Sequence, residues 1–300
     1  MRRHFVGRHH QSSRPCGGGP HPVPAVHPRG KCRVVDVATD VMDLSCHLLG
    51  AQGVRWSWAN DAAAAHGDSV VGSLPVFCWP PQLWVDRPTA HAFATTGSMG
   101  ERRFGFVISW VSTLSTTSGH EASVLVILSS LPLEWLFFEV CLCAHERLVR
   151  AAACSKGEVG DLADSCVAPL LRALHGTLTE QPALCHALIG EGRERALAAL
   201  HSTLRPTGLL STLLAVLLEE RILLVGSDPL VVFRAVEALA SAIDPLEFCG
   251  ALVPLLPEGL HPSVVTLLND AVEPYIVGLH VSHYVCTPRQ PPRSGPAPQP

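Results

Sequence analysis

The sequence has little charge and no long uninterrupted apolar run. Charged side chains make up 16% of its 300 residues, and the formal net charge of -4 provides no overall positive field. This composition does not favour nucleic acid or an anionic membrane surface as a partner. The most apolar long segment, residues 124–143, contains Pro132, Glu134 and Glu139, whereas a transmembrane helix needs roughly 20 predominantly apolar residues. We therefore expect no transmembrane span.

The sequence also lacks the features of a secreted, disulfide-stabilised protein. Its first ten residues, MRRHFVGRHH, contain no signal-peptide apolar core. The eleven cysteines are odd in number, scattered, and mostly embedded in apolar segments such as residues 140–143, which indicates reduced, buried thiols. Apolar residues make up 47% of the chain, enough for the core of one large domain or two medium ones. We expect a globular, cytoplasmic protein.

Motifs for catalysis, nucleotide binding and metal binding are missing as well. There is no Gly-x-Ser-x-Gly sequence, so a hydrolase loses its main support. Residues 190–192 lack the Lys and Ser/Thr that follow in a phosphate-binding loop. Cys141, Cys143 and His145 are each two residues apart, and such neighbours on a helix point to different faces, so we interpret them as core residues. We expect no catalytic residue, no cofactor and no metal.

What the sequence does contain is an alternation of predicted helices and strands in residues 209–281. The first predicted helix has leucines on one face and further apolar residues around it, which indicates a buried helix. The leucines that share this face are Leu210, Leu213, Leu214 and Leu217. Residues 222–225, with the sequence ILLV, follow the charged break at residues 219–221. They predict a strand that is covered on both faces.

A second predicted helix begins at the sequence Ser227-Asp228-Pro229, because an acceptor side chain followed by proline is a strong helix start. It places Val232, Val236, Leu239 and Ile243 inward, and Arg234, Glu237 and Ser241 outward. Two further strands are predicted at residues 248–253 and 275–281, with a short helix at residues 264–268 between them. This order predicts a three-layer α/β unit with a largely parallel sheet and residues 222–225 as its middle strand.

Four short motifs stand out in this region: LLEERILLVGSD at residues 217–228, PLEF at 245–248, VPLLP at 253–257 and AVEPYIVGLH at 271–280. Together they resemble the central segment of a DENN domain. Three positions depart from the family pattern: Glu220 replaces a basic residue, Gly226 replaces the usual serine, and Val272 stands where proline is common. The first two lie at a predicted helix end and a predicted turn, so they affect surface contacts more than the fold.

An upstream region is similar to the first lobe of DENN proteins. The sequence LPVFCWP at residues 74–80 is followed by Phe93 and by the strand pattern at 104–108, with a turn at 97–100. A second hairpin leads to residues 123–128. The helix that follows at residues 133–153 is predicted to place Leu136, Val140, Cys143 and Leu148 inward, and Ser129 or Ser130 would cap it. The resemblance implies a longin-like lobe for residues 74–153.

The remaining segments complete the predicted organisation of an α/β protein with two lobes. Residues 1–30 are predicted to be a disordered tail and residues 287–300 a proline-rich tail. Residues 31–73 are left unassigned, and Trp56-Ser57-Trp58 within them is either a partner-facing aromatic pair or an anchor for a loop. Residues 154–208 are predicted to be connecting helices, broken at Pro169 and at residues 190–192, and residues 209–286 the central lobe. The downstream helical segment of the family is not found.

The resemblance implies guanine-nucleotide exchange on a Rab-type small GTPase, whose switch regions would be held between the two lobes. The alternative is a DENN-like module that binds a GTPase or a scaffold without exchange. Our candidate partner contacts are Glu219, Arg221, Ser227 and Asp228, because they are polar groups at one end of the central strand. The family further implies peripheral association with vesicle or endosomal membranes through the GTPase.

Overall fold

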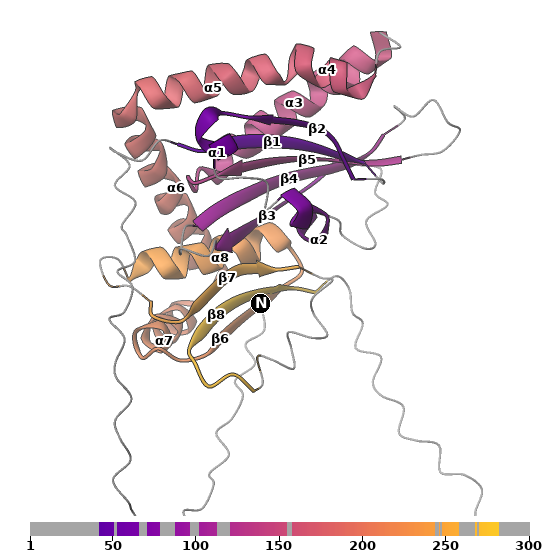
Figure 1. Cartoon of the computed structure of the whole chain (residues 1–300). Helices are drawn as coiled ribbons and strands as arrows, with labels where there is room; N and C mark the ends of the chain where they lie inside the picture. Colours follow the sequence, from indigo (N-terminus) through magenta and orange to yellow (C-terminus); the bar gives the residue numbers. More distant parts are fainter. Residues whose placement is uncertain are drawn as a thin grey trace, which may run out of the picture.

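The structure is a computed structural model, and it shows a mixed α/β protein with two sheets (Figure 1). It describes residues 42–50, 53–65, 71–78, 88–96, 102–112, 121–154, 158–243, 246, 248–257, 268 and 270–281. The two predicted tails, most of the predicted short helix at residues 264–268, and the turn at 97–100 lie outside the described residues.

The larger sheet has five antiparallel strands in the order β2-β1-β5-β4-β3. The strands are β1 (Leu44–Gly50), β2 (Gly53–Ala59), β3 (Thr89–Thr96), β4 (Arg102–Ser112) and β5 (Glu121–Ser129). Both predicted hairpins are confirmed, because β3 pairs with β4 and β4 pairs with β5. The register places Phe93 opposite Gly105 and Phe106 opposite Ile127.

Strands β1 and β2 belong to this sheet although the sequence showed no clear strand pattern there. Every residue of β1 is buried, including Ser45 and His47, so the strand has no exposed face and shows no regular alternation. The Nδ1 atom of His47 lies 2.9 Å from the hydroxyl of Ser57 on β2. On β2, Trp56 is 7% exposed and its indole N–H donates to Asp164 at 2.8 Å. The tryptophan therefore anchors strand β2 to a neighbouring helix, whereas the sequence analysis considered an anchor for a loop.

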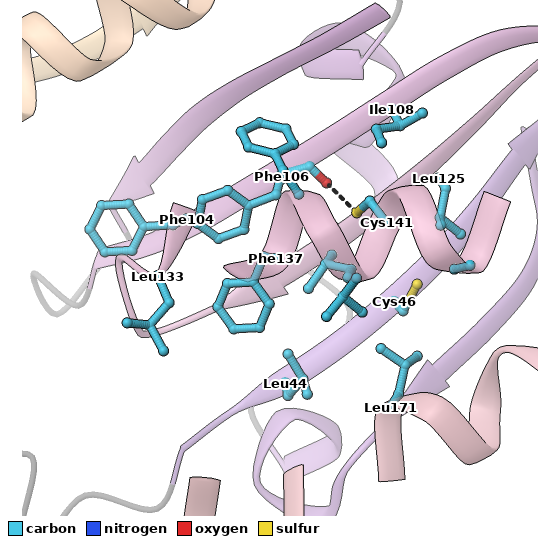
Figure 2. Packing of buried hydrophobic residues seen from close by; sticks show 14 of the residues in the cluster. Leu44, Cys46, Phe104, Phe106, Ile108, Leu125, Leu133, Phe137, Cys141 and Leu171 are labelled. Carbon is cyan, nitrogen blue, oxygen red and sulfur yellow. Dashed lines mark hydrogen bonds between the residues drawn. The ribbon is translucent and has the colours of Figure 1, made fainter. Parts of the chain in front are cut away.

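Helix α3 (Glu134–Cys154) covers one face of the larger sheet (Figure 2). Its buried side chains are Phe137, Phe138, Val140, Cys141, Ala144 and Leu148. The sequence therefore predicted the inward positions of Val140 and Leu148 correctly, whereas Leu136 and Cys143 are only half-buried. Phe137 and Cys141 take the central places because they meet Phe106 of β4: the rings stack at 5.0 Å, and the Cys141 thiol donates to the Phe106 carbonyl at 3.7 Å.

The opposite face of the larger sheet has a smaller apolar cluster. Two short elements cover it, the 3-10 helix η1 (Val71–Ser73) and α2 (Leu74–Cys78). Leu74 and Cys78 are fully buried there, and the ring of Phe77 stacks on Phe93 of β3 at 4.8 Å. The short α1 (Asp61–Ala65) follows β2. The larger sheet is thus packed on both faces.

Three helices connect the two halves of the molecule: α4 (Val159–Cys166), α5 (Ala168–Glu180) and α6 (Pro182–Thr203). The predicted break near Pro169 is confirmed, since α4 ends before Val167 and the proline stands in the first turn of α5. The predicted break at residues 190–192 is wrong, because α6 runs through it. Gly192 faces the ring of Trp135, and Arg195 covers the same ring at 4.8 Å, so tertiary packing offsets the low helix propensity of glycine.

The smaller sheet has three parallel strands in the order β6-β8-β7. They are β6 (Ile222–Gly226), β7 (Ala251–Leu256) and β8 (Tyr275–His280). The strand predicted at residues 248–253 therefore begins three residues later than expected, whereas β6 and β8 begin at the predicted residues. The predicted cover on both faces of residues 222–225 is only partial, because Leu223 and Val225 are half-buried. The middle strand is β8 and not residues 222–225 as predicted, because the crossover from β6 to β7 leaves a space that β8 fills.

Two helices flank this parallel sheet, α7 (Pro206–Leu217) and α8 (Pro229–Ala242). Helix α8 packs on β6, β7 and β8 and buries Val232, Val236 and Leu239, as predicted. It lies between the two sheets (Figure 1). The predicted buried face of α7 is right only for Leu213, which is half-buried against the core. The buried residues of the helix are Thr212, Ala215 and Val216. The leucines on the other side are largely exposed, because the helix is apolar all round and the neighbouring α6 and α8 meet its narrower face.

Candidate partner-binding surface

The amino end of the parallel sheet begins with a sharp reversal after α7. The Glu219 N–H donates to the Val216 carbonyl at 3.0 Å, and the Glu220 N–H donates to the Ala215 carbonyl at 2.9 Å. This is the hydrogen-bond pattern of a Schellman motif, whose residue after the helix cap adopts a left-handed conformation and is usually glycine. Glu219 holds that place with a φ of 52°. The reversal leaves Glu219 and Glu220 exposed beside the start of β6.

Arg221 has a structural partner at the same end of the sheet. Its Nη1 atom donates to the Ala271 carbonyl at 2.7 Å, across 50 residues of sequence. The bond ties the start of β6 to the segment that leads into β8. Arg221 is exposed, so it also faces solvent with its remaining donors.

The carboxyl end of the parallel sheet carries the other two predicted residues. One carboxylate oxygen of Asp228 accepts from the backbone N–H groups of Leu230 and Val231, at 2.9 and 3.2 Å. Asp228 is thus the N-cap of α8, as the sequence predicted. Ser227 is exposed, and its carbonyl accepts from the Nε2 atom of His280 at 3.2 Å. Ser227, Asp228 and His280 therefore meet at this end.

The four predicted contact residues do not lie together. Glu219 and Arg221 precede β6, whereas Ser227 and Asp228 follow it. Five residues of extended strand separate the two pairs by roughly 17 Å. The prediction that they share one end of the strand is corrected by this geometry, and their role as partner contacts stays a prediction. The sequence itself contains this signal, since the pairs flank the strand on either side.

Helix α7 presents an apolar surface that the sequence analysis placed in the core. It consists of Leu210, Leu214, Leu217 and Leu218, which are 69%, 55%, 53% and 61% exposed, and we call it the leucine face. These residues recur at helical spacing, so they form one stripe along the helix. The stripe ends beside the exposed Glu219 and Glu220. Contiguous exposed apolar side chains of this kind are typical of contact surfaces.

Two ion pairs connect α8 to the antiparallel half of the molecule, one to α3 and one to β4, and the sequence analysis missed both. Three hydrogen bonds of 2.6–2.9 Å join Arg234 to Glu134 at the start of α3. Arg102 at the start of β4 donates to Glu237 at 2.6 Å. Hydrogen bonding to Glu134 raises the pKa of Arg234, and attraction to Glu134 and Asp228 acts in the same direction. The sequence signal was present as two opposite charges, three residues apart, on an otherwise apolar helix.

Apolar residues also join the two sheets. Val232 and Phe233 of α8 and Leu255 of β7 belong to the same buried cluster as Phe104 of β4 and Ala92 of β3. Helix α8 and strand β7 both contact the edge strand β3. The two sheets therefore share one continuous core.

Several cysteine and histidine side chains of the described residues are buried or packed against neighbours. Within them, no three His, Cys, Asp or Glu side chains are grouped closely enough to hold a metal ion. Burial raises the pKa values of Cys46, Cys78 and Cys141 well above the usual range of a thiol, so these groups are poor nucleophiles. His145 packs edge-on against Trp110 at 4.6 Å, and burial lowers its pKa. These arrangements are those of core residues, and none of them forms a nucleophile with an adjacent base.

Residues 175–294 match the model of the DENN (AEX-3) domain. The chain carries a DENN domain. The matched segment begins in α5 and contains α6, α7, α8 and the parallel sheet, so both groups of predicted contact residues and the leucine face lie inside the DENN domain. At the level of the domain, this match is consistent with the family of Rab exchange factors. No curated protein matches the chain, and no described helix is long and apolar enough to cross a membrane.

Proposed function

We propose that the protein is a guanine-nucleotide exchange factor for a Rab-type small GTPase. The observation that carries the proposal is the DENN domain at residues 175–294. The lobe assignments belong to the same proposal: residues 74–153 form a longin-like upstream lobe, residues 154–208 connect, and residues 209–286 form a three-layer central lobe. Strands β1 and β2 extend the upstream sheet by hydrogen bonding to β5 and to each other.

Exchange requires binding energy and no covalent step. A surface that binds the nucleotide-free GTPase more tightly than the GDP-bound form must weaken GDP binding by the same factor, because the two equilibria are linked. The two lobes grip the switch regions of the GTPase from two sides. A shared core and two ion pairs across the junction support this proposal, since they hold both lobes in place before the partner arrives.

The contact residues of the proposal are two separate groups. Ser227 and Asp228 stand at the carboxyl end of the parallel strands, where open α/β sheets commonly bind ligands. Glu219 and Arg221 form a second contact at the amino end. Through a membrane-bound GTPase, the protein would associate peripherally with vesicle or endosomal membranes from the cytoplasm.

The test is a release assay with a panel of Rab proteins that carry fluorescent GDP. Faster release with one or a few members of the panel supports exchange, and unchanged release with the whole panel contradicts it. Ser227→Arg and Glu219→Arg then probe the two contact groups. Each is expected to lower kcat/KM by about tenfold, because a new positive charge at the edge of the interface changes association with and dissociation from the GTPase. Ser202→Arg on the exposed side of α6 is the matched control and is expected to leave the rate unchanged.

The second candidate function is a module that binds a GTPase or a scaffold without exchange. The leucine face of α7 favours it, because this apolar surface lies on the flank of the central lobe and requires no grip between lobes to be used. Binding of a Rab protein without faster GDP release would support the module. Leu214→Asp should then weaken binding, while the same change should have little effect on an exchange activity that resides between the lobes.

A further inference from the structure

The junction between the two sheets combines an apolar centre with two ion pairs of opposite polarity. On α8, the cation Arg234 and the anion Glu237 are three residues apart and so lie on one side of the helix. Their partners come from two different elements of the other lobe, Glu134 from α3 and Arg102 from β4. The two pairs are therefore independent attachments of one helix to two points of the upstream lobe.

The ion pairs and the apolar centre differ in what they can contribute. Phe233 and Leu255 are 3% and 7% exposed within the shared core. Burial of such apolar side chains favours contact between the two sheets but does not fix their relative orientation, because the hydrophobic effect is non-directional. The charged side chains are partly exposed, Arg234 at 36% and Arg102 at 29%. Pairs in such places add little net stability, because desolvation and side-chain ordering offset the attraction. These pairs do, however, form only in a narrow range of geometries. This holds above all for Arg234 and Glu134, which are joined by three hydrogen bonds.

The order of charges also disfavours other placements of α8. A shift of the helix by about one turn along its axis would bring Arg234 towards Arg102, or Glu237 towards Glu134. Either shift places like charges opposite each other, and at partly buried sites such contacts are unfavourable. The apolar residues of the junction would tolerate such a shift better, because their contacts are less specific.

We propose that Arg234 and Glu237 are positioning residues that fix the orientation of the parallel sheet relative to the antiparallel sheet. We name the two ion pairs the orientation clasp. The apolar centre holds the lobes together, and the clasp selects one of the arrangements that the apolar centre permits. Its consequence for exchange rests on the proposed function, because a grip on a GTPase from two sides requires both lobes at a defined angle.

The experiment exchanges the charges of the clasp on one side and then on both. Arg234→Glu with Glu237→Arg reverses α8 and preserves net charge, and Glu134→Arg with Arg102→Glu reverses the opposite side. The readout is the distance distribution between two spin labels, introduced through an unnatural amino acid at the exposed Glu139 on α3 and Thr207 on α7. We expect the α8 swap to broaden or shift the distribution and the fourfold swap to restore a single narrow distance.

An exposed pair on one helix is the matched control. Glu146 and Arg150 of α3 form an ion pair with side chains 63% and 79% exposed, and exchange of their charges should leave the distance unchanged. A narrow, unshifted distribution for the α8 swap would overturn the clasp. So would a fourfold swap that stays folded by circular dichroism and keeps the broadened distribution. If the α8 swap does not fold, the neutral pair Arg234→Gln with Glu237→Gln replaces it, with the same expected broadening.

A second readout separates the clasp from the proposed function. If the wild-type protein catalyses exchange, the α8 swap should lower kcat/KM by about tenfold or more through loss of positioning, and the fourfold swap should recover most of it. If the wild type catalyses no exchange while the distances behave as expected, the proposed function fails and the clasp stands. If exchange is present and unaffected by the swap, the positioning role fails while the exchange function stands.

Discussion

The antiparallel sheet and the parallel sheet differ in how far each supports itself. In the antiparallel sheet, central strands such as β1 are buried along their whole length, and both faces carry their own apolar cluster. In the parallel sheet, β6 alternates buried and half-buried residues. Its covering helix α8 shares Val232 and Phe233 with the core of the other lobe. The parallel sheet, which holds the candidate contact residues, has a buried cluster of its own with α7 and α8. We expect it to draw a further part of its stability from its attachment to the antiparallel sheet.

The largest effect is expected when a side chain is removed from the antiparallel core. Phe106 is fully buried and lies beside Phe137 (Figure 2). Its ring centroid is 5.0 Å from that of Phe137 and 5.8 Å from that of Phe138. We expect Phe106→Ala to lower the free energy of unfolding by about 3–5 kcal/mol, as for other large-to-small core changes. Urea denaturation measures the loss, and hydrogen exchange should show that β7 and β8 lose protection together with β4 and β5.

The matched control for this loss is Leu214→Ala on the leucine face. Its side chain is 55% exposed, so we expect a change within about 0.5 kcal/mol. Retained protection in β7 and β8 of the Phe106→Ala protein would show that the parallel sheet is self-supporting, contrary to the comparison.

The next largest effect tests the parallel sheet from within. A methyl group on Gly278 of β8 would collide with the carbonyl oxygen of Pro254 and lie 2.7 Å from Val232 of α8. Because backbone atoms cannot move aside as a flexible side chain can, Gly278→Ala should cost about 2–3 kcal/mol. Hydrogen exchange should place the lost protection in β7, β8 and α8, with β4 and β5 affected much less.

Gly190→Ala in α6 is the opposite case and serves as the control. Nothing lies within 4 Å of a methyl group at this helical position, so the substitution should raise the free energy of unfolding by about 0.5–1 kcal/mol. Equal effects of the two glycine substitutions on thermal unfolding would contradict the close approach at Gly278.

The same two regions show what sequence reasoning could and could not reach. Local signals sufficed for the hairpins around Phe93 and for the start of α8 at Asp228, because turn residues and caps act over a few positions. Strand order in the parallel sheet depends on a crossover and left no local signal. The predicted burial of Leu214 in α7 was wrong, because the spacing of leucines indicates a helical face but not whether another element packs against that face.

The candidate surface was predictable only in part, for the same reason. The sequence marked Glu219, Arg221, Ser227 and Asp228 as polar residues around a buried strand, and the structure places them there in two groups. The sequence analysis placed Arg234 and Glu237 on the solvent-facing side of a helix. Their partners lie 100 and 135 residues away, and periodicity on one helix carries no information about such distant contacts.

A smaller effect is expected at the N-cap of α8. Asp228→Ala removes the acceptor for two backbone N–H groups and should lower the free energy of unfolding by about 1 kcal/mol. Asp228→Ser is the matched control, because serine also caps helices, and it should retain most of the stability. If the GTPase releases GDP equally slowly with both variants, the carboxylate of Asp228 contacts the GTPase. If release is slow only with the alanine variant, the role of Asp228 is to cap α8.

The smallest effect concerns the turn that leads into the parallel sheet. Glu219 occupies a left-handed conformation with a φ of 52°, in which a side chain costs about 1 kcal/mol relative to glycine. Relief of this cost by Glu219→Gly should raise the free energy of unfolding by roughly 0.5–1 kcal/mol. The greater conformational entropy of glycine in the unfolded chain offsets part of this gain. Glu220→Gly, without positive φ, is the control and should be neutral or destabilising. A Glu219→Gly protein that is more stable yet slower in exchange would show that the side chain is retained at this strained position for contact with the GTPase.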